Sequence, residues 1–252
     1  LGVPSVALYS EVDRNALHVQ VADEAICIGP AEAAKSYLNV PSIISAAEVS
    51  GADAVHPGYG FLSENADFAD TCAQCGLTFI GPTGDNMRQW GLKVPARRLA
   101  KKLGLPLLPG SERLESVEEA MEAAAEIGFP VILKASAGGG GRGMQIIHDA
   151  DALEQAYPRA AQEALKAFGN GELYLERYIE HPRHIEFQVL ADGQGGAWIL
   201  GDRECSIQRR HQKIVEEAPG IVLSQALREE MNAKIRHALI ESGYRSAGTL
   251  EF

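Results

Sequence analysis

The chain has 252 residues, of which 46% are hydrophobic and 23% charged, a composition typical of a globular protein with one large domain or a few small ones. Its formal net charge of −11 disfavours nucleic acid and anionic membranes as partners, so an anion site must be a local basic pocket. No apolar run approaches the ~20 residues that span a bilayer, and the start of the chain lacks the pattern of a secretory signal. We therefore expect neither a nucleic-acid nor a membrane partner.

The first section, to about residue 90, alternates short apolar strands with helical stretches. Such alternation is typical of an open, mostly parallel sheet with helices on its faces. Ser63 is expected to be an N-cap, because its hydroxyl can accept a hydrogen bond from a free backbone N–H. The expected strands are 3–9, 25–28, 52–55 and 78–80, and the expected helices are 41–50, 63–75 and 93–103.

The four cysteines are expected to be reduced thiols of a cytoplasmic protein. Cys72 and Cys75 form a Cys-x-x-Cys pair near the end of an expected helix. No second pair stands at the spacing of a zinc site, so a metal or redox role is disfavoured.

A glycine-rich loop is the most informative segment. Residues 134–143 read Lys-Ala-Ser-Ala-Gly-Gly-Gly-Gly-Arg-Gly and lie between two apolar runs of strand length. Glycines expose backbone N–H groups with no Cβ in the way, and Lys134 and Arg142 add positive charge. This combination indicates that the loop is a lid that folds over nucleotide phosphates. The alternative is a flexible hairpin or linker, which would usually carry serine. The loop fits neither a Walker loop nor a dinucleotide loop, because it runs from strand to strand.

The segment around the loop is expected to form a small lid over 106–180. Ser116 and Glu119 form a capping box for a helix over 117–127, and a longer helix is expected over about 149–168.

Beyond residue 183 the alternation of polar and apolar residues is typical of antiparallel strands, followed by a helix from its N-cap Ser224 to Ser242. The basic run 209–213 lies on a strand-like stretch, so its side chains would project to both faces. Such a run either lines an anion pocket or forms a solvated, ion-paired strand, and taken alone it favours the second.

Polar side chains follow several of the expected strands. Glu176 follows strand 173–175, where an edge backbone would pair with an adenine ring and the carboxylate would accept from an amine or a ribose hydroxyl. His184 and Glu186 share one face of the next strand. Glu251, on the last strand, suits Mg²⁺, because this hard cation prefers oxygen ligands and bridges phosphates. Taken alone, the signal at Glu176 is weak, and Glu251 alone is better explained as an ordinary ion-pair partner.

Taken together and in order, these segments resemble the biotin carboxylase family of the ATP-grasp superfamily, along nearly the whole chain. The matching stretches include 35–39 (Lys-Ser-Tyr-Leu-Asn), 56–65 (His-Pro-Gly-Tyr-Gly-Phe-Leu-Ser-Glu-Asn), the glycine loop, 182–186 (Pro-Arg-His-Ile-Glu) and 208–217. The fold class implied is α/β, an ATP-grasp with four parts. These are an N-terminal open parallel α/β domain (1–90), a linker helix (91–105), a small mobile α+β lid (106–180) and the first part of a C-terminal antiparallel α+β domain (181–252).

The resemblance also implies roles for individual residues. Lys213 is implied to be catalytic and to orient bicarbonate, and Glu251 to bind both the metal and ATP. Two lysines and the loop glycines are implied to hold the phosphates, and a strip after strand 173–175 to hold adenine and ribose. The implied ATP-binding residues are Lys93, Lys134, Gly138, Gly139, Gly140, Gly141, Glu176, Arg177, Tyr178, Ile179, His184, Gln208, His211 and Glu251.

The chemistry implied by the resemblance is ATP-dependent carboxylation of biotin, a ligase activity. Bicarbonate attacks the γ-phosphate of ATP bound with Mg²⁺ or Mn²⁺, and the CO₂ released from carboxyphosphate is captured by biotin on a carrier domain. Lysines and loop amides suit this reaction, because phosphoryl transfer depends on positioning and charge neutralisation. The implied partners are a biotin carboxyl carrier domain, a carboxyltransferase and a second copy in a homodimer, within an acyl-CoA or acetyl-CoA carboxylase of the cytoplasm or mitochondrial matrix.

Two alternatives stay open: another ATP-grasp ligase with an amine acceptor, as in the carbamoyl-phosphate synthetase group, and a nucleotide-binding module without catalysis. Both ends of the chain read as cut, since Leu1 and Gly2 resemble a helix end and 248–252 a strand that stops halfway. The resemblance implies that a second metal carboxylate, a catalytic arginine and the base that activates bicarbonate follow Phe252. We therefore expect the 252-residue chain by itself to lack turnover.

Overall fold

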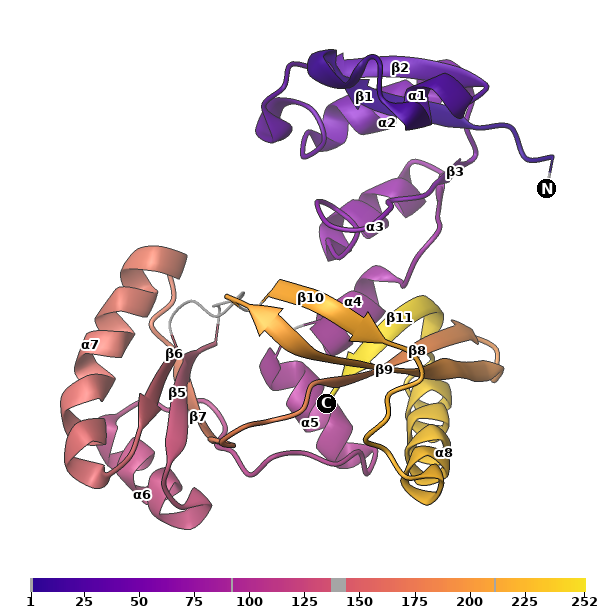
Figure 1. Ribbon diagram of the computed structural model, residues 1–252. Coiled ribbons are helices and arrows are strands. Elements are labelled where there is room, and N and C mark those ends of the chain that lie inside the picture. The colour runs from indigo at the N-terminus through magenta and orange to yellow at the C-terminus, as the bar shows by residue number, and fades with distance from the viewer. Residues whose placement is uncertain (1, 92, 137–143, 211) are drawn as a thin grey trace. The chain divides into compact units, whose positions relative to one another are not determined.

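The computed structural model describes residues 2–91, 93–136, 144–210 and 212–252 (Figure 1). The chain forms two compact units, each described below by itself. The first unit is Leu1–Gly91 with Ala191–Gly196 and Ser242–Ala247, and the second is Leu92–Leu190, Ala197–Glu241 and Gly248–Phe252. Within the four described ranges, every helix is too short or too polar to cross a membrane.

The first unit contains two parallel strand pairs, which confirms the expected parallel α/β arrangement. Two short 3₁₀ turns, Glu11–Asp13 and Ala33–Lys35, accompany these elements. In Figure 1, α2 lies along the pair β1 and β2. The strands are β1 (Val6–Ser10) with β2 (Glu24–Gly29) and β3 (Ala54–Val55) with β4 (Thr78–Phe79), and the helices are α1 (Leu17–Val21), α2 (Val40–Ser50), α3 (Ala66–Gln74) and α4 (Gly84–Gly91).

One apolar core joins α2 and α3 to the two strand pairs. Ile43 and Ile44 of α2 pack with Phe68 and Cys72 of α3 and with Ile28 of β2. The ring of Phe68 also meets that of Phe79 edge-on, with ring centroids 5.8 Å apart. Burial of Cys72 raises the pKa of its thiol to about 11, so the thiol is protonated and unreactive at neutral pH.

The start of α3 differs from the sequence expectation. Ser63 is not the N-cap, because it lies in the preceding turn, where its backbone N–H donates to Gly60. The helix begins at Ala66, and the cap is Asn65, whose side chain accepts from the N–H of Phe68 at 2.8 Å. Both residue types cap helices well, so the turn geometry decides between them.

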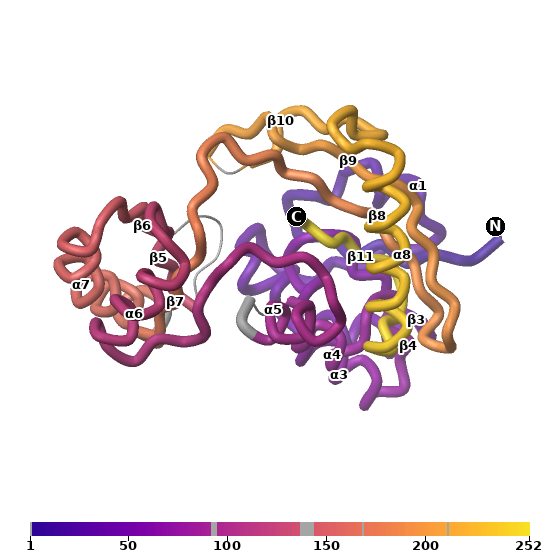
Figure 2. The backbone as a smooth tube through the Cα atoms, turned by 90° about the horizontal axis from the view of Figure 1, so that it is seen from below, coloured from indigo at the N-terminus to yellow at the C-terminus, as the bar shows by residue number. Residues whose placement is uncertain are grey.

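The second unit includes a three-stranded antiparallel sheet in the order β6-β5-β7. Two helices, α6 and α7, contact this sheet, as Figure 2 shows. The expected strand–loop–strand arrangement is confirmed for the two flanking strands, while 137–143, with Gly138, Gly139, Gly140 and Gly141, lie outside the described residues. The elements are α6 (Val117–Ile127), β5 (Val131–Ala135), β6 (Met144–Ile147), α7 (Ala150–Phe168) and β7 (Leu173–Arg177).

Side-chain caps fix the ends of these helices. Ser116 accepts from the N–H of Glu119 at 3.2 Å, which confirms the expected start of α6. The carboxylate of Glu119 accepts from the N–H of Glu115, one residue before the position that a standard capping box predicts. Asp149 caps α7 by accepting from the N–H of Ala152 at 2.8 Å.

A four-stranded sheet in the order β10-β9-β8-β11 lies mostly in the second unit. The basic run 209–213 was expected to lie on one strand, and this expectation is wrong. Strand β9 ends at Arg209, Arg210 takes a positive φ of 52°, and β10 begins at Gln212. Helix α8 contacts β9 and is capped by Ser224 (Figure 1). The elements are α5 (Lys93–Lys102), β8 (Ile185–Asp192), β9 (Ala197–Arg209), β10 (Gln212–Glu217), α8 (Gln225–Glu241) and β11 (Arg245–Glu251).

Candidate nucleotide and anion site

The alternation of β5 separates its core side chains from its polar ones. Val131, Leu133 and Ala135 are buried in the core with α6 and α7, so Lys134 projects from the other face of the strand. In the antiparallel register Lys134 lies opposite Tyr174, and Ile132 lies opposite Glu176. Lys134 and Glu176 are therefore diagonal neighbours on one face of the sheet.

Glu176 forms an ion pair with Lys134 and a second one with Arg97 of α5. Lys134 Nζ donates to Glu176 Oε2, and Arg97 Nη1 donates to Glu176 Oε1 at 2.7 Å. The Glu176 side chain is only 12% exposed, so its charge depends on these two cations for compensation. We name this set, Arg97, Lys134 and Glu176, the cation–carboxylate triad.

Arg177 and Tyr178, two further residues of the predicted adenine strip, are hydrogen-bonded within the protein. The N–H of Arg177 donates to Pro109 at 2.8 Å, and the N–H of Tyr178 donates to Pro130 at 3.0 Å. The guanidinium of Arg177 donates to the carbonyl of Ile127 at 3.3 Å. These two N–H groups are already used, so an adenine ring would have to bond to other backbone groups of this strip.

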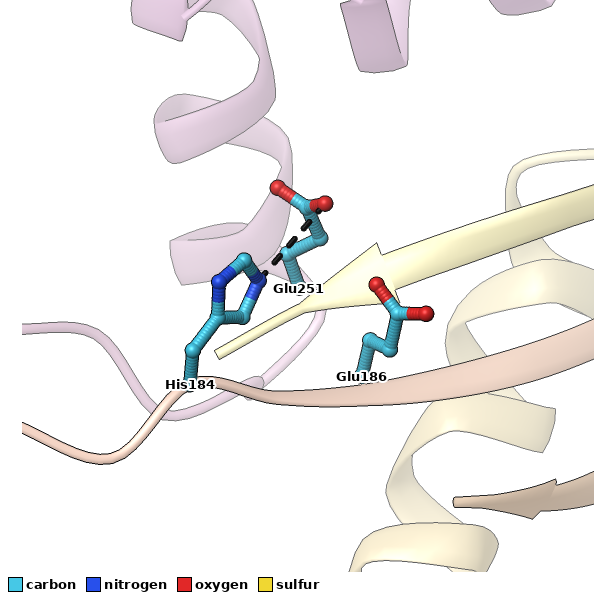
Figure 3. A group of neighbouring side chains, drawn as sticks. All are labelled: His184, Glu186 and Glu251. Carbon is cyan, nitrogen blue, oxygen red and sulfur yellow. Dashed lines mark ion pairs between the residues drawn. The ribbon is translucent and has the colours of Figure 1, made fainter. Parts of the chain in front are cut away.

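A second polar cluster lies on the four-stranded sheet. Lys213 Nζ donates to Glu186 Oε2 and, at 2.9 Å, to Glu251 Oε1. Arg203 Nε donates to Glu186 Oε1 at 2.5 Å, so both oxygens of this carboxylate bind a cation. Figure 3 shows Glu186 and His184 projecting from neighbouring positions of one chain segment toward Glu251 on β11.

The charges of this cluster are set by its contacts. Burial raises the pKa of Glu186, which is 2% exposed, but hydrogen bonds from Lys213 and Arg203 outweigh it and hold the pKa below its ordinary value. Burial lowers the pKa of Lys213, but hydrogen bonds to Glu186 and Glu251 raise it above its ordinary value. Lys213 is thus an ammonium at neutral pH, able to hold an anion but not to act as a base.

His184 is hydrogen-bonded through one ring nitrogen, and its other ring nitrogen faces Glu251 at ion-pair distance (Figure 3). Its Nδ1 accepts from the amide of Gln208 at 2.6 Å, so a neutral ring carries its proton on Nε2. That Nε2 is buried, has no hydrogen-bond partner within the described residues and lies 3.6 Å from Glu251 Oε1, beyond hydrogen-bonding distance. An oxygen of an anionic ligand would satisfy it.

Three side chains of this cluster could contribute ligands to a divalent cation. Ligand atoms of His184, Glu186 and Glu251 lie within 4.8 Å of one another. Glu186 is a poor ligand, because both of its oxygens already bind cations. Glu251 is 55% exposed and supplies the hard oxygen that Mg²⁺ or Mn²⁺ prefers. The residues therefore fit a cation held by Glu251 and completed by phosphate oxygens.

The structure brings the predicted residues into two groups, one on each sheet of the second unit. Lys134 and Glu176 lie on the first, and His184, Gln208, Lys213 and Glu251 lie on the second. His211 and the side chain of Lys93 lie outside the described residues. Sequence reasoning missed Arg97 and Arg203 and did not identify Glu186 as a site residue, although its position two residues after His184 on one strand face was a usable signal.

Comparison with known protein families agrees with this geometry. Residues 1–87 match the biotin carboxylase N-terminal domain, and residues 93–252 match the ATP binding domain of the carbamoyl-phosphate synthase L chain. The second match covers more than half of the chain and both groups of site residues.

Individual proteins match along the whole chain. Biotin carboxylase of Haemophilus influenzae is 54% identical over 254 residues, which cover 100% of this chain and 57% of that protein. The biotin carboxylase–βγ-ATP complex of Campylobacter jejuni is 48% identical with a TM-score of 0.93, covering 100% of this chain and 56% of that one. The biotin carboxylase domain dimer of Hydrogenobacter thermophilus 2-oxoglutarate carboxylase, in complex with MgADP, ADP and bicarbonate, is 50% identical with a TM-score of 0.91, covering 100% and 55%.

The parallel α/β section and the two antiparallel sheets thus form an ATP-grasp fold, as the sequence predicted. The chain belongs to the biotin carboxylase family. It spans 57% of the length of the Haemophilus influenzae protein.

Proposed function

We propose that this chain supplies the nucleotide and bicarbonate sites of a ligase that carboxylates biotin with ATP, through carboxyphosphate. The observation that carries the proposal is Lys213, an ammonium held between Glu186 and Glu251 beside the unsatisfied Nε2 of His184. A bicarbonate ion offers the negative charge and the oxygen acceptors that these two donors require. The bicarbonate in the Hydrogenobacter thermophilus complex supports this reading.

The nucleotide would bind across the two groups of site residues. Lys134, Lys93 and the glycines 138–141 would hold the phosphates, Glu176 to Ile179 the adenine and ribose, and His184, Gln208, His211 and Glu251 the remaining contacts. Glu251 would share Mg²⁺ or Mn²⁺ with the phosphates, and the bound metal would neutralise charge that develops on them. The segment 106–180 would act as a mobile lid that excludes water from carboxyphosphate.

The proposal extends to partners of the longer protein. Biotin would be presented by a carboxyl carrier domain, and the carboxylated product would pass to a carboxyltransferase. Homodimer formation is supported by the dimer named for the Hydrogenobacter thermophilus domain. The bacterial sources of the proteins compared above favour the cytoplasm over the mitochondrial matrix.

The direct test uses the longer form of the protein. ATP hydrolysis is measured with free biotin, with and without bicarbonate. Hydrolysis that requires bicarbonate and yields carboxybiotin is the expected result. Hydrolysis that proceeds equally without bicarbonate would count against the proposal.

A second candidate is a different ATP-grasp ligase, which forms an acyl-phosphate intermediate and uses an amine as the acceptor. The match of residues 93–252 to a carbamoyl-phosphate synthase domain favours keeping it. A product assay separates the two, because this candidate forms carbamoyl phosphate when ammonia is supplied and forms no carboxybiotin. Calorimetric titration of the 252-residue chain with MgATP addresses nucleotide binding without catalysis.

A further inference from the structure

Arg97 is held in place by contacts on two sides of its guanidinium. Nη1 donates to Glu176 Oε1 at 2.7 Å, and Nη2 donates to the carbonyl of Leu108 at 2.9 Å. Gly110 leaves room for this group, since a Cβ there would collide with Nη2 and with the carbonyl oxygen of Leu175. The Arg97 side chain is 20% exposed, and these contacts hold its fork-shaped guanidinium in a fixed orientation.

The cation–carboxylate triad carries one carboxylate between two cations. Glu176 offers one oxygen to Lys134 and the other to Arg97, so the three side chains together have a single positive charge. A lysine whose only nearby counter-ion is a desolvated carboxylate is held by that carboxylate. A lysine that shares the carboxylate with an arginine keeps part of its charge available for a second anion.

We propose that Arg97 is a positioning residue for the nucleotide polyphosphate, acting through Glu176. By binding one oxygen of Glu176, it releases Lys134 from full pairing and leaves the triad attractive to phosphate oxygens. The inference rests on the proposed nucleotide site, and it adds a residue on the helix α5 that does not itself reach the nucleotide. Without Arg97, Glu176 would pair with Lys134 alone, and the local charge would fall to zero.

Arg98 provides a matched control on the same helix. It pairs with Glu112 at 2.7 Å, but both side chains are more than half exposed. Exposed ion pairs are weak and screened by salt, so loss of the Arg98 charge should have little effect on a site elsewhere. Arg97→Met and Arg98→Met thus remove the same kind of side chain from one helix, in a buried and in an exposed setting.

The test is calorimetric titration of the 252-residue chain with MgATP and with adenosine, by direct or competitive binding. Arg97→Met is expected to weaken MgATP binding by about tenfold and adenosine binding by about threefold or less, because both ligands would contact Glu176 but only MgATP uses the charge of Lys134. Arg98→Met is expected to change neither. A role of Arg97 in packing alone would weaken both ligands equally, and that result would overturn the proposal.

A double-mutant cycle isolates the route through Glu176. In the Glu176→Gln background no carboxylate remains to be shared, so adding Arg97→Met should change MgATP affinity by less than about twofold. A further tenfold loss in that background would overturn the proposed route. If Arg97→Met alone does not fold, Arg97→Lys keeps the charge and should retain more MgATP affinity than Arg97→Gln, while equal affinities would overturn the proposal.

The wild-type titration separates this inference from the function on which it rests. Wild-type chain that binds no MgATP would remove both the nucleotide site and the role of Arg97. Wild-type chain that binds MgATP, with Arg97→Met binding it equally well, would remove the role of Arg97 alone.

Discussion

Glu186 is the residue around which the polar cluster of the four-stranded sheet is arranged. Its carboxylate is buried at 2% exposure and binds Arg203 on one oxygen and Lys213 on the other. Removing one partner of a buried ion pair costs more than the pair contributes, because the remaining charge is left uncompensated. The position of Lys213 and the fold of this sheet are thus linked through one side chain.

The depressed pKa of Glu186 predicts a pH-dependent contribution to stability. A carboxyl group with a lower pKa in the folded state than in the unfolded state stabilises the fold fully above its unfolded pKa of about 4.3, and the contribution is lost as the pH falls through the folded pKa. Glu186→Gln lacks this titration. Urea unfolding should therefore show a difference in unfolding free energy between wild type and Glu186→Gln that is largest at neutral pH and shrinks in acid. A difference that stays constant down to about pH 3.5 would contradict the assignment.

Lys213→Ala should impair the use of bicarbonate and spare ATP. The ammonium of Lys213 is held within the four-stranded sheet, whereas Lys134, the proposed phosphate lysine, belongs to the other sheet. Loss of one charge-assisted contact is worth about 1.5 to 3 kcal/mol, so kcat/KM for bicarbonate should fall by about 10- to 100-fold in the longer form. Steady-state kinetics with each substrate varied in turn provide the measurement.

Lys234→Ala is the control for this substitution, because Lys234 pairs with Glu230 on the exposed face of α8. It should leave the kinetics of both substrates unchanged. Equal losses of ATP affinity and of bicarbonate use in Lys213→Ala would contradict the separate role given to Lys213.

At the scale of elements, the N-cap of α7 is a clear local determinant. Asp149 accepts from the N–H of Ala152, and its negative charge also faces the positive end of the helix. Asp149→Ala should lower the unfolding free energy by about 0.5 to 2 kcal/mol. Asp151→Ala removes a carboxylate from the same first turn without removing the cap, so chemical denaturation should show a smaller loss. Equal losses would indicate that charge, and not capping, is responsible.

The elements best predicted from the sequence are those fixed by neighbours along the chain. The caps Ser116 and Ser224 follow from residue type and from the periodic pattern that comes after them, and the structure confirms both. The apolar runs on each side of the glycine loop likewise predicted β5 and β6. Asn65 and Ser63 show the limit, because two good capping residues stand close together and only the turn between them decides.

The parts that sequence reasoning missed depend on pairing between distant segments. Arg97 meets Glu176 across 79 positions of sequence, and nothing in a helix pattern marks one of its arginines as buried. Glu186 was visible as a polar residue on a strand, but its burial depends on which strands lie beside it. The bend at Arg210 was missed because no glycine or asparagine marks that left-handed position.

At the scale of the molecule, the two compact units have separate cores and separate optical reporters. The two tryptophans fall one in each unit, Trp90 on α4 and Trp198 on β9. Ile235 of α8 is fully buried in the second unit, and Phe68 of α3 is 2% exposed in the first. Multidomain chains often unfold in more than one step, so each tryptophan should report the unfolding of its own unit.

Ile235→Ala should therefore lower the unfolding free energy that Trp198 reports by about 2 to 5 kcal/mol. The unfolding free energy that Trp90 reports should fall less. Phe68→Ala should have the opposite preference. The measurement is fluorescence-detected urea unfolding of each variant in backgrounds that contain Trp90→Phe or Trp198→Phe. Identical shifts at both tryptophans would show that the units unfold as one.

The alternation of β5 has a consequence for how this segment tolerates change. Odd-numbered positions of the strand, such as Leu133, pack in the core, while the even-numbered Lys134 lies on the opposite face and is proposed to bind phosphate. A substitution on one face of the strand can therefore leave the other face unchanged. A single-residue insertion or deletion ahead of Lys134 would exchange the two sets at once, burying a cation and exposing the aliphatic side chains. Related sequences should accordingly have no insertions or deletions in β5, even where single residues of the strand are substituted.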